Sequence, residues 1–167
     1  MTSQQIDRSD GAPTWRFLWS HPAHTFALGF GSGLSPIAPG TAGTLAALPL
    51  WLLLQDCSFV LQSAVVLLSF FLGIYFCHKA ADDLGVHDHG AIVWDEFVGL
   101  WLVLLFVPAD GYWWLASFLL FRFFDIAKPW PISHFDRRVG GGFGIMLDDI
   151  IAAIFSLAVV FFLAAIL

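Results

Sequence analysis

The sequence predicts an all-α protein embedded in a membrane as a polytopic bundle of about five short transmembrane helices. Of the 167 residues, 59% are apolar and 12% are charged, whereas a soluble domain has roughly 45–50% apolar and roughly 25% charged residues. The mean hydropathy is +0.80. Long stretches contain no charged residue, and charges or turn residues separate them. A soluble globule of this size would leave much of this apolar surface in water.

The same composition excludes other classes of protein. A disordered chain is too poor in hydrophobic residues to match it. A nucleic-acid-binding protein is excluded by the charge, since 7 Lys and Arg face 13 Asp and Glu. Cys57 and Cys77 lie at the two ends of one apolar run, about 30 Å apart if that run is a helix. We therefore expect no disulfide between them. The polar residues 1–15 do not resemble a cleaved signal peptide.

The first charge-free stretch, 17–55, contains many Gly, Ser, Pro and Thr residues between Gly29 and Thr44. We expect one helix over 41–54, preceded by a loop or a re-entrant segment. The apolar residues 58–76 are long enough to cross the roughly 30 Å of hydrocarbon in a bilayer.

Three further spans are predicted in the second half of the chain. The segments 97–107 and 112–121 are short and are separated by the turn residues 108–111. The segment 150–167 is a second span of full length. The short spans must tilt, or the bilayer must thin around them.

The distribution of charge gives this topology an orientation. If every span crosses, the linkers around 55–57 and 108–111 lie on one side, and neither contains Lys or Arg. All 7 Lys and Arg residues then lie on the other side, which the positive-inside rule assigns to the cytoplasm. Most acidic residues share that side. We expect a polar tail over 1–23 and a single membrane-embedded domain over 24–167.

Asp95 and Glu96 form the first candidate site, where the third predicted span begins. One interpretation is that the helix dipole simply stabilises two acids at the start of the helix. However, apolar sequence follows at once from Phe97, so unpaired carboxylates there would be costly. This position favours a counter-ion, either a metal ion or a basic residue.

Arg122, Asp125 and Lys128 form the second candidate site. Their spacing of three places them on one face of a helix that ends at or just before Lys128, because Pro129 follows. One interpretation is a salt-bridged ladder at the membrane interface. The other is an anion clamp, in which Arg and Lys bind a phosphate and the carboxylate binds a metal ion.

Asp148 and Asp149 form the third candidate site, after a glycine-rich segment over 140–144 that we expect to be flexible. One acid can cap the last helix, but two exceed what a cap requires. Together with Asp95, Glu96 and Asp125 they would offer the oxygen ligands that Mg²⁺ prefers. No group of His and Cys with zinc-site spacing competes with them.

The segment 31–44 is the fourth candidate, because its glycines and hydroxyls lead into a helix start that could present backbone N–H groups to a phosphate. The Gly-Lys-Ser/Thr of a P-loop is absent, and close packing of small residues is the alternative. The cysteine-phosphatase loop, the Gly-x-Ser-x-Gly elbow and the Asp-x-Asp pattern are also absent. What remains is attack by a metal-held water with Arg and Lys stabilising a phosphoryl group.

Four motifs together resemble the phosphatidylglycerophosphatase A family. They are GLSPIAPGT at 33–41, VWDEFVG at 93–99, FRFFDIAKPWPI at 121–132 and GIMLDDI at 144–150. The resemblance runs from about residue 24 to the C-terminus, in the order of the family. It implies a Mg²⁺-dependent phosphatase of the bacterial inner membrane that converts phosphatidylglycerophosphate to phosphatidylglycerol. The lipid substrate would present its head group at the cytoplasmic leaflet.

We therefore predict roles for individual residues. One or two Mg²⁺ ions would be held by acids, with Asp148 orienting or capping. Arg122 and Lys128 would neutralise the phosphoryl oxygens, and other donors would bind the rest of the phosphate or the lipid's bridging phosphate. The predicted metal ligands are Asp95, Glu96, Asp125, Asp148 and Asp149, and the further donors are Ser35, Thr41, Arg137 and Arg138. The alternatives are a small cation transporter or channel subunit that uses the same acids, and a scaffold whose acids only cap helices.

Overall fold

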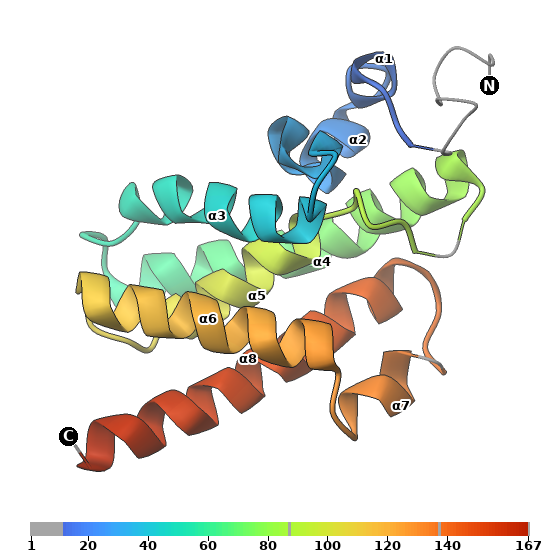
Figure 1. Ribbon diagram of the computed structural model, residues 1–167. Coiled ribbons are helices and arrows are strands. Elements are labelled where there is room, and N and C mark those ends of the chain that lie inside the picture. Colours follow the sequence, from blue (N-terminus) through green and yellow to red (C-terminus); the bar gives the residue numbers. More distant parts are fainter. Residues whose placement is uncertain (1–11, 87, 137, 167) are drawn as a thin grey trace.

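The computed structural model describes residues 12–86, 88–136 and 138–166, and the regular elements of these residues are helices (Figure 1). The predicted all-α class is therefore confirmed for this part of the chain. In chain order the elements are α1 (Trp15–Leu18), α2 (Pro22–Ala27), the 3₁₀ helix η1 (Gly29–Leu34), α3 (Pro39–Leu52), α4 (Phe59–Leu84), α5 (Trp94–Leu104), α6 (Gly111–Ala127), α7 (Ile132–Asp136) and α8 (Gly141–Ile166).

The five helices α3, α4, α5, α6 and α8 lie side by side as a bundle, and α1 and α2 lie across one side of it (Figure 1). Helix α5 is the centre of this bundle, since it packs against α3, α4, α6 and α8. Ten of its 11 residues are buried. Because its neighbours surround it, α5 fixes the position of whatever side chains its first turn carries.

Two of the described helices are long and apolar enough to cross a membrane. Helices α4 and α8 each have 26 residues, with mean hydropathies of 2.1 and 2.6 over their best windows. Helices α3, α5 and α6 have 14, 11 and 17 residues. Large apolar side chains on α4 are exposed, which suits contact with lipid. They are Phe59, Val60, Leu61, Leu67, Leu68, Phe71, Leu72 and Tyr75.

The last helix begins earlier than the sequence predicts. Helix α8 starts at Gly141 rather than at residue 150, so the segment expected to be flexible forms its first turn. The glycines allow close packing: a Cβ on Gly142 would lie 1.9 Å from the carbonyl oxygen of Ile74 in α4. As a result, Asp148 and Asp149 lie two turns inside the helix. The prediction that one of them caps the helix is wrong.

Helix α4 is also longer than predicted and continues past Phe76 to Leu84. Its last turns are polar, and ion pairs between residues four apart stabilise them, Lys79 with Asp83 and His78 with Asp82. The helix ends at Gly85, whose φ of +72° is a left-handed conformation that glycine adopts readily. The predicted end at Phe76 is therefore the end of the apolar sequence and not the end of the helix.

The first part of the chain contains short helices where a loop was expected. Helices α1 and α2 and the 3₁₀ helix η1 occupy 15–34, and Phe17 and Leu18 are fully buried in the common core. Helix α3 confirms the predicted helix over 41–54, beginning two residues earlier at Pro39. Cys57 and Cys77 are both free, as expected.

Candidate active site

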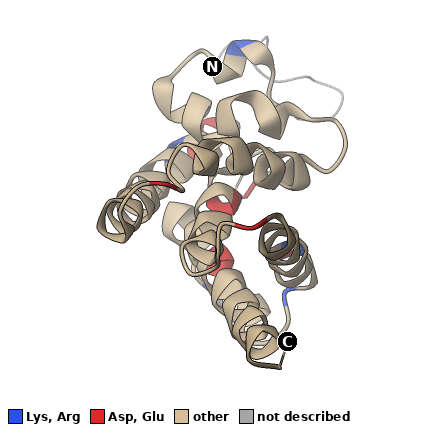
Figure 2. Cartoon of the chain, turned by 90° about the vertical axis from the view of Figure 1, so that its left-hand side faces the viewer, with Lys and Arg blue, Asp and Glu red and all other residues tan. Residues whose placement is uncertain are grey.

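Three acidic residues from two helices meet inside the bundle. Asp95 and Glu96 lie in the first turn of α5, and Asp149 lies in α8. One carboxylate oxygen of each lies within 4.8 Å of the others. The three side chains belong to residues that are only 9%, 8% and 2% exposed. Seen end-on, acidic segments lie between the helices in the middle of the bundle (Figure 2).

The start of α5 directs its acids into the bundle rather than to its own backbone. The N-cap residue Val93 makes no side-chain capping bond, and its N–H instead donates to the carbonyl oxygen of Ala27 at 2.8 Å. Asp95 and Glu96 still profit from the positive end of the helix dipole. Their burial beside Asp149 goes beyond that role, because it crowds three carboxylates in a place with little water.

Arg122 of α6 is the nearest described cation to this group. Its Nη1 lies 2.5 Å from Asp125 Oδ2 and 3.5 Å from Glu96 Oε1. Both partners on α6 are 13% exposed at their side chains. Asp125 also faces Asp149 on α8. The predicted pairing of Arg122 and Asp125 on one helix face is thus confirmed, and it brings Asp125 beside the three clustered acids.

Lys128 departs from the predicted face. Helix α6 ends at Ala127, and Lys128 follows in a left-handed conformation with φ of +38°. Its ammonium group forms an ion pair with Asp148 of α8 instead of continuing the ladder with Asp125. The two cations therefore serve different acids, and Lys128 links the end of α6 to α8.

The start of α3 lies close to Glu96 and Arg122. The contacts are made by Gly40 and Thr44, which we did not predict as individual site residues. A Cβ on Gly40 would lie 2.3 Å from Glu96 Oε1 and 3.0 Å from Arg122 Nη2. The buried Thr44 hydroxyl donates to the carbonyl oxygen of Gly40 at 2.8 Å and lies 3.5 Å from Arg122 Nη1. The sequence indicates that Gly40 and Thr44 share one face of the helix, because they are four residues apart.

The remaining predicted donors lie elsewhere. Ser35 donates to the carbonyl oxygen of Ile37 at 2.8 Å and lines a cavity of about 350 Å³ together with Pro39 and His89. Thr41 is half-buried in the first turn of α3. Arg138 lines a second cavity, of about 300 Å³, with Trp130, Ser133 and His134. Arg137 lies outside the described residues.

The donor set suits a hard divalent cation. The three buried oxygens Asp95 Oδ1, Glu96 Oε2 and Asp149 Oδ2 have no hydrogen-bond partner within the described part of the chain. Buried carboxylate oxygens are costly without a positive partner. Carboxylates are also the ligands that Mg²⁺ prefers. Residues of this chain therefore fit a magnesium site at the junction of α5 and α8.

Comparison with known proteins shows the family of this chain. The family model described as phosphatidylglycerophosphatase A matches residues 25–164. The chain belongs to this family. Phosphatidylglycerophosphatase A of Escherichia coli is 52% identical over 149 residues, covering 89% of this chain and 87% of the relative. The protein of the same name from Haemophilus influenzae is 52% identical over 158 residues, covering 92% and 95%.

A third relative has a different name. A protein of Bacteroides thetaiotaomicron, provisionally named a phosphatidylinositol-3-phosphatase, is 41% identical over 139 residues, covering 77% of this chain and 84% of its own. No solved structure matches the chain. The residues matched by the family model include α3, α5, α6 and most of α8. They therefore include Asp95, Glu96, Arg122 and Asp149.

Proposed function

We propose that this chain hydrolyses the terminal phosphate monoester of phosphatidylglycerophosphate and releases phosphatidylglycerol. The names of the two relatives at 52% identity support this substrate. The observation that carries the chemistry is the meeting of Asp95, Glu96 and Asp149 beside Arg122. Such a site combines oxygen ligands for a metal ion with a guanidinium group for a phosphoryl oxygen.

Charge supports Mg²⁺ as the cofactor. Five carboxylates of this region face the two cations Arg122 and Lys128, a formal excess of three negative charges when all are ionised. A phosphate monoester adds roughly −1.5 to −2 at neutral pH. The substrate would be repelled unless divalent cations were bound. Asp95, Glu96 and Asp149 would hold the ion, with Asp125 beside them, and Mg²⁺ would supply Lewis-acid activation of water and of the phosphoryl group.

The residues of the chain supply binding and orientation around that centre. Arg122 is held by Asp125 and Glu96, so its guanidinium group is already oriented before a phosphate arrives. Lys128, held by Asp148, offers a second cation at the end of α6. Gly40 lets the start of α3 approach both Glu96 and Arg122. The burial of the acids keeps bulk water away, which strengthens every electrostatic contact there.

The remaining donors would bind the rest of the lipid head group. Arg138 lines a cavity of about 300 Å³ with Trp130, Ser133 and His134. This cavity is suited to the bridging phosphate, since an Arg and a hydroxyl can both donate to its oxygens. Ser35, which follows η1, and Thr41, in the first turn of α3, would be further donors to the head group.

We also propose that all five helices of the bundle cross the membrane, with the site at the cytoplasmic end. Of the short helices, α5 packs against α4, and α3 and α6 pack against α5 (Figure 1). Three of the described cations, Lys79, Arg122 and Lys128, lie in or just after the last two turns of α4 and α6, whereas the turns at 53–58 and 105–110 contain no Lys or Arg. A lipid head group at the cytoplasmic leaflet would meet the site directly.

The test is phosphate release from phosphatidylglycerophosphate in detergent micelles by the purified full-length chain. We expect release with Mg²⁺, none with EDTA, and at least a hundredfold loss in Asp95→Asn. Asp56→Asn, an exposed acid in the turn before α4, is the matched control and should retain activity. Phosphatidylinositol 3-phosphate serves as a competing substrate, because the Bacteroides relative is named for it.

Two outcomes would contradict the proposal. Release that persists in EDTA would remove the magnesium role. No release from folded protein would remove the phosphatase assignment, and cation flux in liposomes would then test the transporter alternative. That alternative finds no support in the family match.

A further inference from the structure

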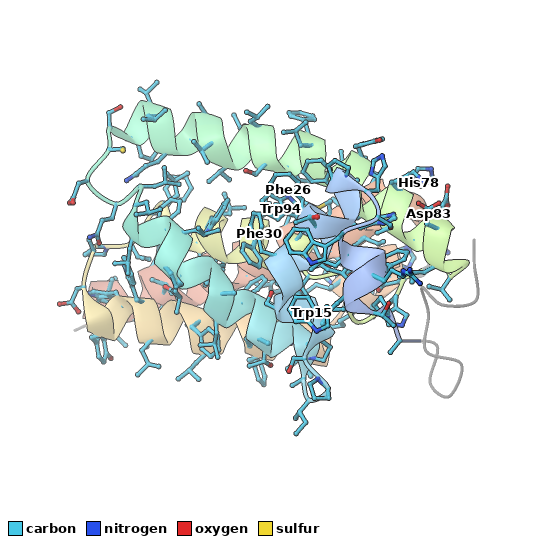
Figure 3. All side chains as sticks on the ribbon, turned by 90° about the horizontal axis from the view of Figure 1, so that it is seen from above. Trp15, Phe26, Phe30, His78, Asp83 and Trp94 are labelled. Carbon is cyan, nitrogen blue, oxygen red and sulfur yellow. The ribbon has the colours of Figure 1, made fainter. Side chains whose placement is uncertain are left out.

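The segment before α3 carries an exposed aromatic surface that the site does not use. Trp15, Trp19 and Phe30 are 62%, 70% and 47% exposed. We call these three side chains the aromatic face. In Figure 3, seen from above, Phe26, Phe30 and Trp94 are labelled close together and Trp15 a little apart from them. Large aromatic side chains this exposed are unusual on a surface that faces water.

The segment is apolar on two sides. Trp15 and Trp19 are four residues apart, and the Trp19 N–H donates to the Trp15 carbonyl oxygen at 3.2 Å, so both lie on one face of the α1 turn. The opposite face, Phe17 and Leu18, is fully buried against the bundle. Packing against the protein therefore accounts for the inner face only, and the outer face needs an apolar or amphipathic neighbour of its own.

Contacts between α2 and α4 show where α2 lies along the length of α4. Phe26 of α2 stacks on Phe76, at the end of the apolar part of α4, with ring centroids 4.8 Å apart. His24 of α2 lies 2.8 Å from Asp83, in the charged last turn of α4. Seven residues of helix separate these two positions, about 10 Å along the axis. Helix α2 thus lies beside the transition from apolar to charged sequence, which in a membrane helix marks the boundary between acyl chains and head groups.

Phe30 is held outward by its backbone. Its φ of +57° is rare for a residue with a side chain, and Gly31 follows with φ of +104°. One side of the ring contacts Phe26 and Trp94, at centroid distances of 5.3 and 6.2 Å. The other side is exposed. A strained conformation persists when the surrounding structure requires it, and here it keeps an aromatic ring on the same surface as Trp15.

We propose that the aromatic face lies in the head-group region of a phospholipid bilayer and anchors α1, α2 and η1 to the membrane beside the site. Helix α2, which follows α1, packs against α4, and α4 has exposed aromatic side chains of its own, Phe71 and Tyr75, at 64% and 53%. Trp side chains prefer this depth, because the indole ring is apolar and its N–H is polar. The segment is therefore interfacial and not re-entrant. This inference depends on α4 being a membrane helix and not on the phosphatase chemistry.

The experiment measures the depth of single spin labels in the full-length chain. Trp19→Cys and Phe30→Cys are prepared with Cys57→Ser, while the buried Cys77 stays in place. The proteins are placed in vesicles of phosphatidylcholine and phosphatidylglycerol. Collisions of the nitroxide with oxygen, which concentrates in lipid, are compared with collisions with a water-soluble nickel chelate. Leu68→Cys on the exposed side of α4 reports lipid, and Asp56→Cys reports water.

We expect the oxygen-to-nickel collision ratio at positions 19 and 30 to lie between those at 68 and 56, and at least threefold above that at 56. A ratio equal to that at position 56 would place the face in water and overturn the proposal. Low collision rates with both reagents would show that protein covers the face, such as a second copy of the chain, and would overturn it as well. Trp15→Cys is the second site if either variant fails to fold. Phosphate release is not read in this experiment, so its outcome is independent of the proposed function.

Discussion

Helices α4 and α5 differ in almost every respect although they pack against each other. Helix α4 has 26 residues and exposes most of its apolar side chains, whereas α5 has 11 residues of which ten are buried. Helix α4 begins at a capping Ser58, and α5 begins at Val93, which makes no side-chain cap. The longer helix faces the surroundings. The shorter one carries Asp95 and Glu96 to the middle of the bundle.

This difference shows that the most membrane-like segment is not the most important one for the site. Length and hydropathy select helices that contact lipid along their whole length. A helix surrounded by other helices can be short, because its ends are covered by protein and not by lipid. The site depends on a helix that is too short to meet this criterion. Four experiments test this contrast, in decreasing order of expected effect.

The largest effect is expected for Asp149→Asn, which removes a carboxylate that faces the start of α5. Loss of several kcal/mol of transition-state stabilisation corresponds to about 10²–10³-fold in rate. Phosphate release should fall by that factor while the helical circular dichroism signal stays unchanged. Asp56→Asn is the control. An equal loss of phosphate release in both variants would show that the Asp149 carboxylate has no specific role in the reaction.

Gly40→Ala should have the next largest effect. The new methyl group would lie 2.3 Å from Glu96 Oε1 and 3.0 Å from Arg122 Nη2, so the site must shift. A misplacement of about 1 Å can cost about 10²-fold in rate. Gly111→Ala, at the start of α6, meets no atom within 4 Å and should leave phosphate release unchanged. If Gly40→Ala kept full activity, the approach of α3 to Glu96 would not matter to the reaction.

The pair Leu100→Ala and Leu68→Ala compares the two helices directly by stability. Leu100 in α5 is fully buried and Leu68 in α4 is 59% exposed. Truncation of a buried Leu costs about 2–5 kcal/mol, because a cavity remains. Leu68 would exchange a contact with lipid for a smaller one and should cost less than about 1 kcal/mol. Unfolding by SDS in mixed micelles measures both, and equal values would remove the distinction between α4 and α5.

Ser58→Ala should have the smallest effect. The Ser58 hydroxyl accepts the Leu61 N–H at 3.3 Å, a long bond at the exposed start of α4. Loss of a cap costs about 0.5–2 kcal/mol, and this one belongs at the low end. The same unfolding assay is the measurement, with Ser58→Thr as a variant that keeps the capping oxygen. A larger loss than that of Leu100→Ala would show that α4 depends on its cap more than α5 depends on its packing.

Most of the site residues could be predicted because membrane sequence makes charge conspicuous. Asp95, Glu96 and Arg122 stand out in an apolar chain, and an ionisable group near hydrocarbon needs a reason to be there. The predicted helix over 41–54 and the end of α6 before Pro129 also follow from local rules. These features depend on residues that are close in the sequence.

The features that could not be predicted depend on contacts between distant residues. Glycines at the start of α8 predicted a flexible loop, but Gly142 packs on the backbone of α4 and the helix begins there. Gly40 and Thr44 approach Arg122 only because α3 lies beside α6 in space. Lys128 turns toward Asp148 through a left-handed backbone conformation that no local rule demands of lysine.

The position of Asp149 so far along the chain has a consequence for how the protein is made. Synthesis proceeds from the N-terminus, so Asp95 and Glu96 leave the ribosome well before α8 does. A nascent chain that has reached residue 140 contains two of the three clustered acids and lacks the helix that packs on α4, α5, α6 and α7. Such a chain lacks Asp149, the third member of the buried cluster. We expect an unfinished or truncated copy to release no phosphate, because the proposed site is complete only when the last described helix is in place.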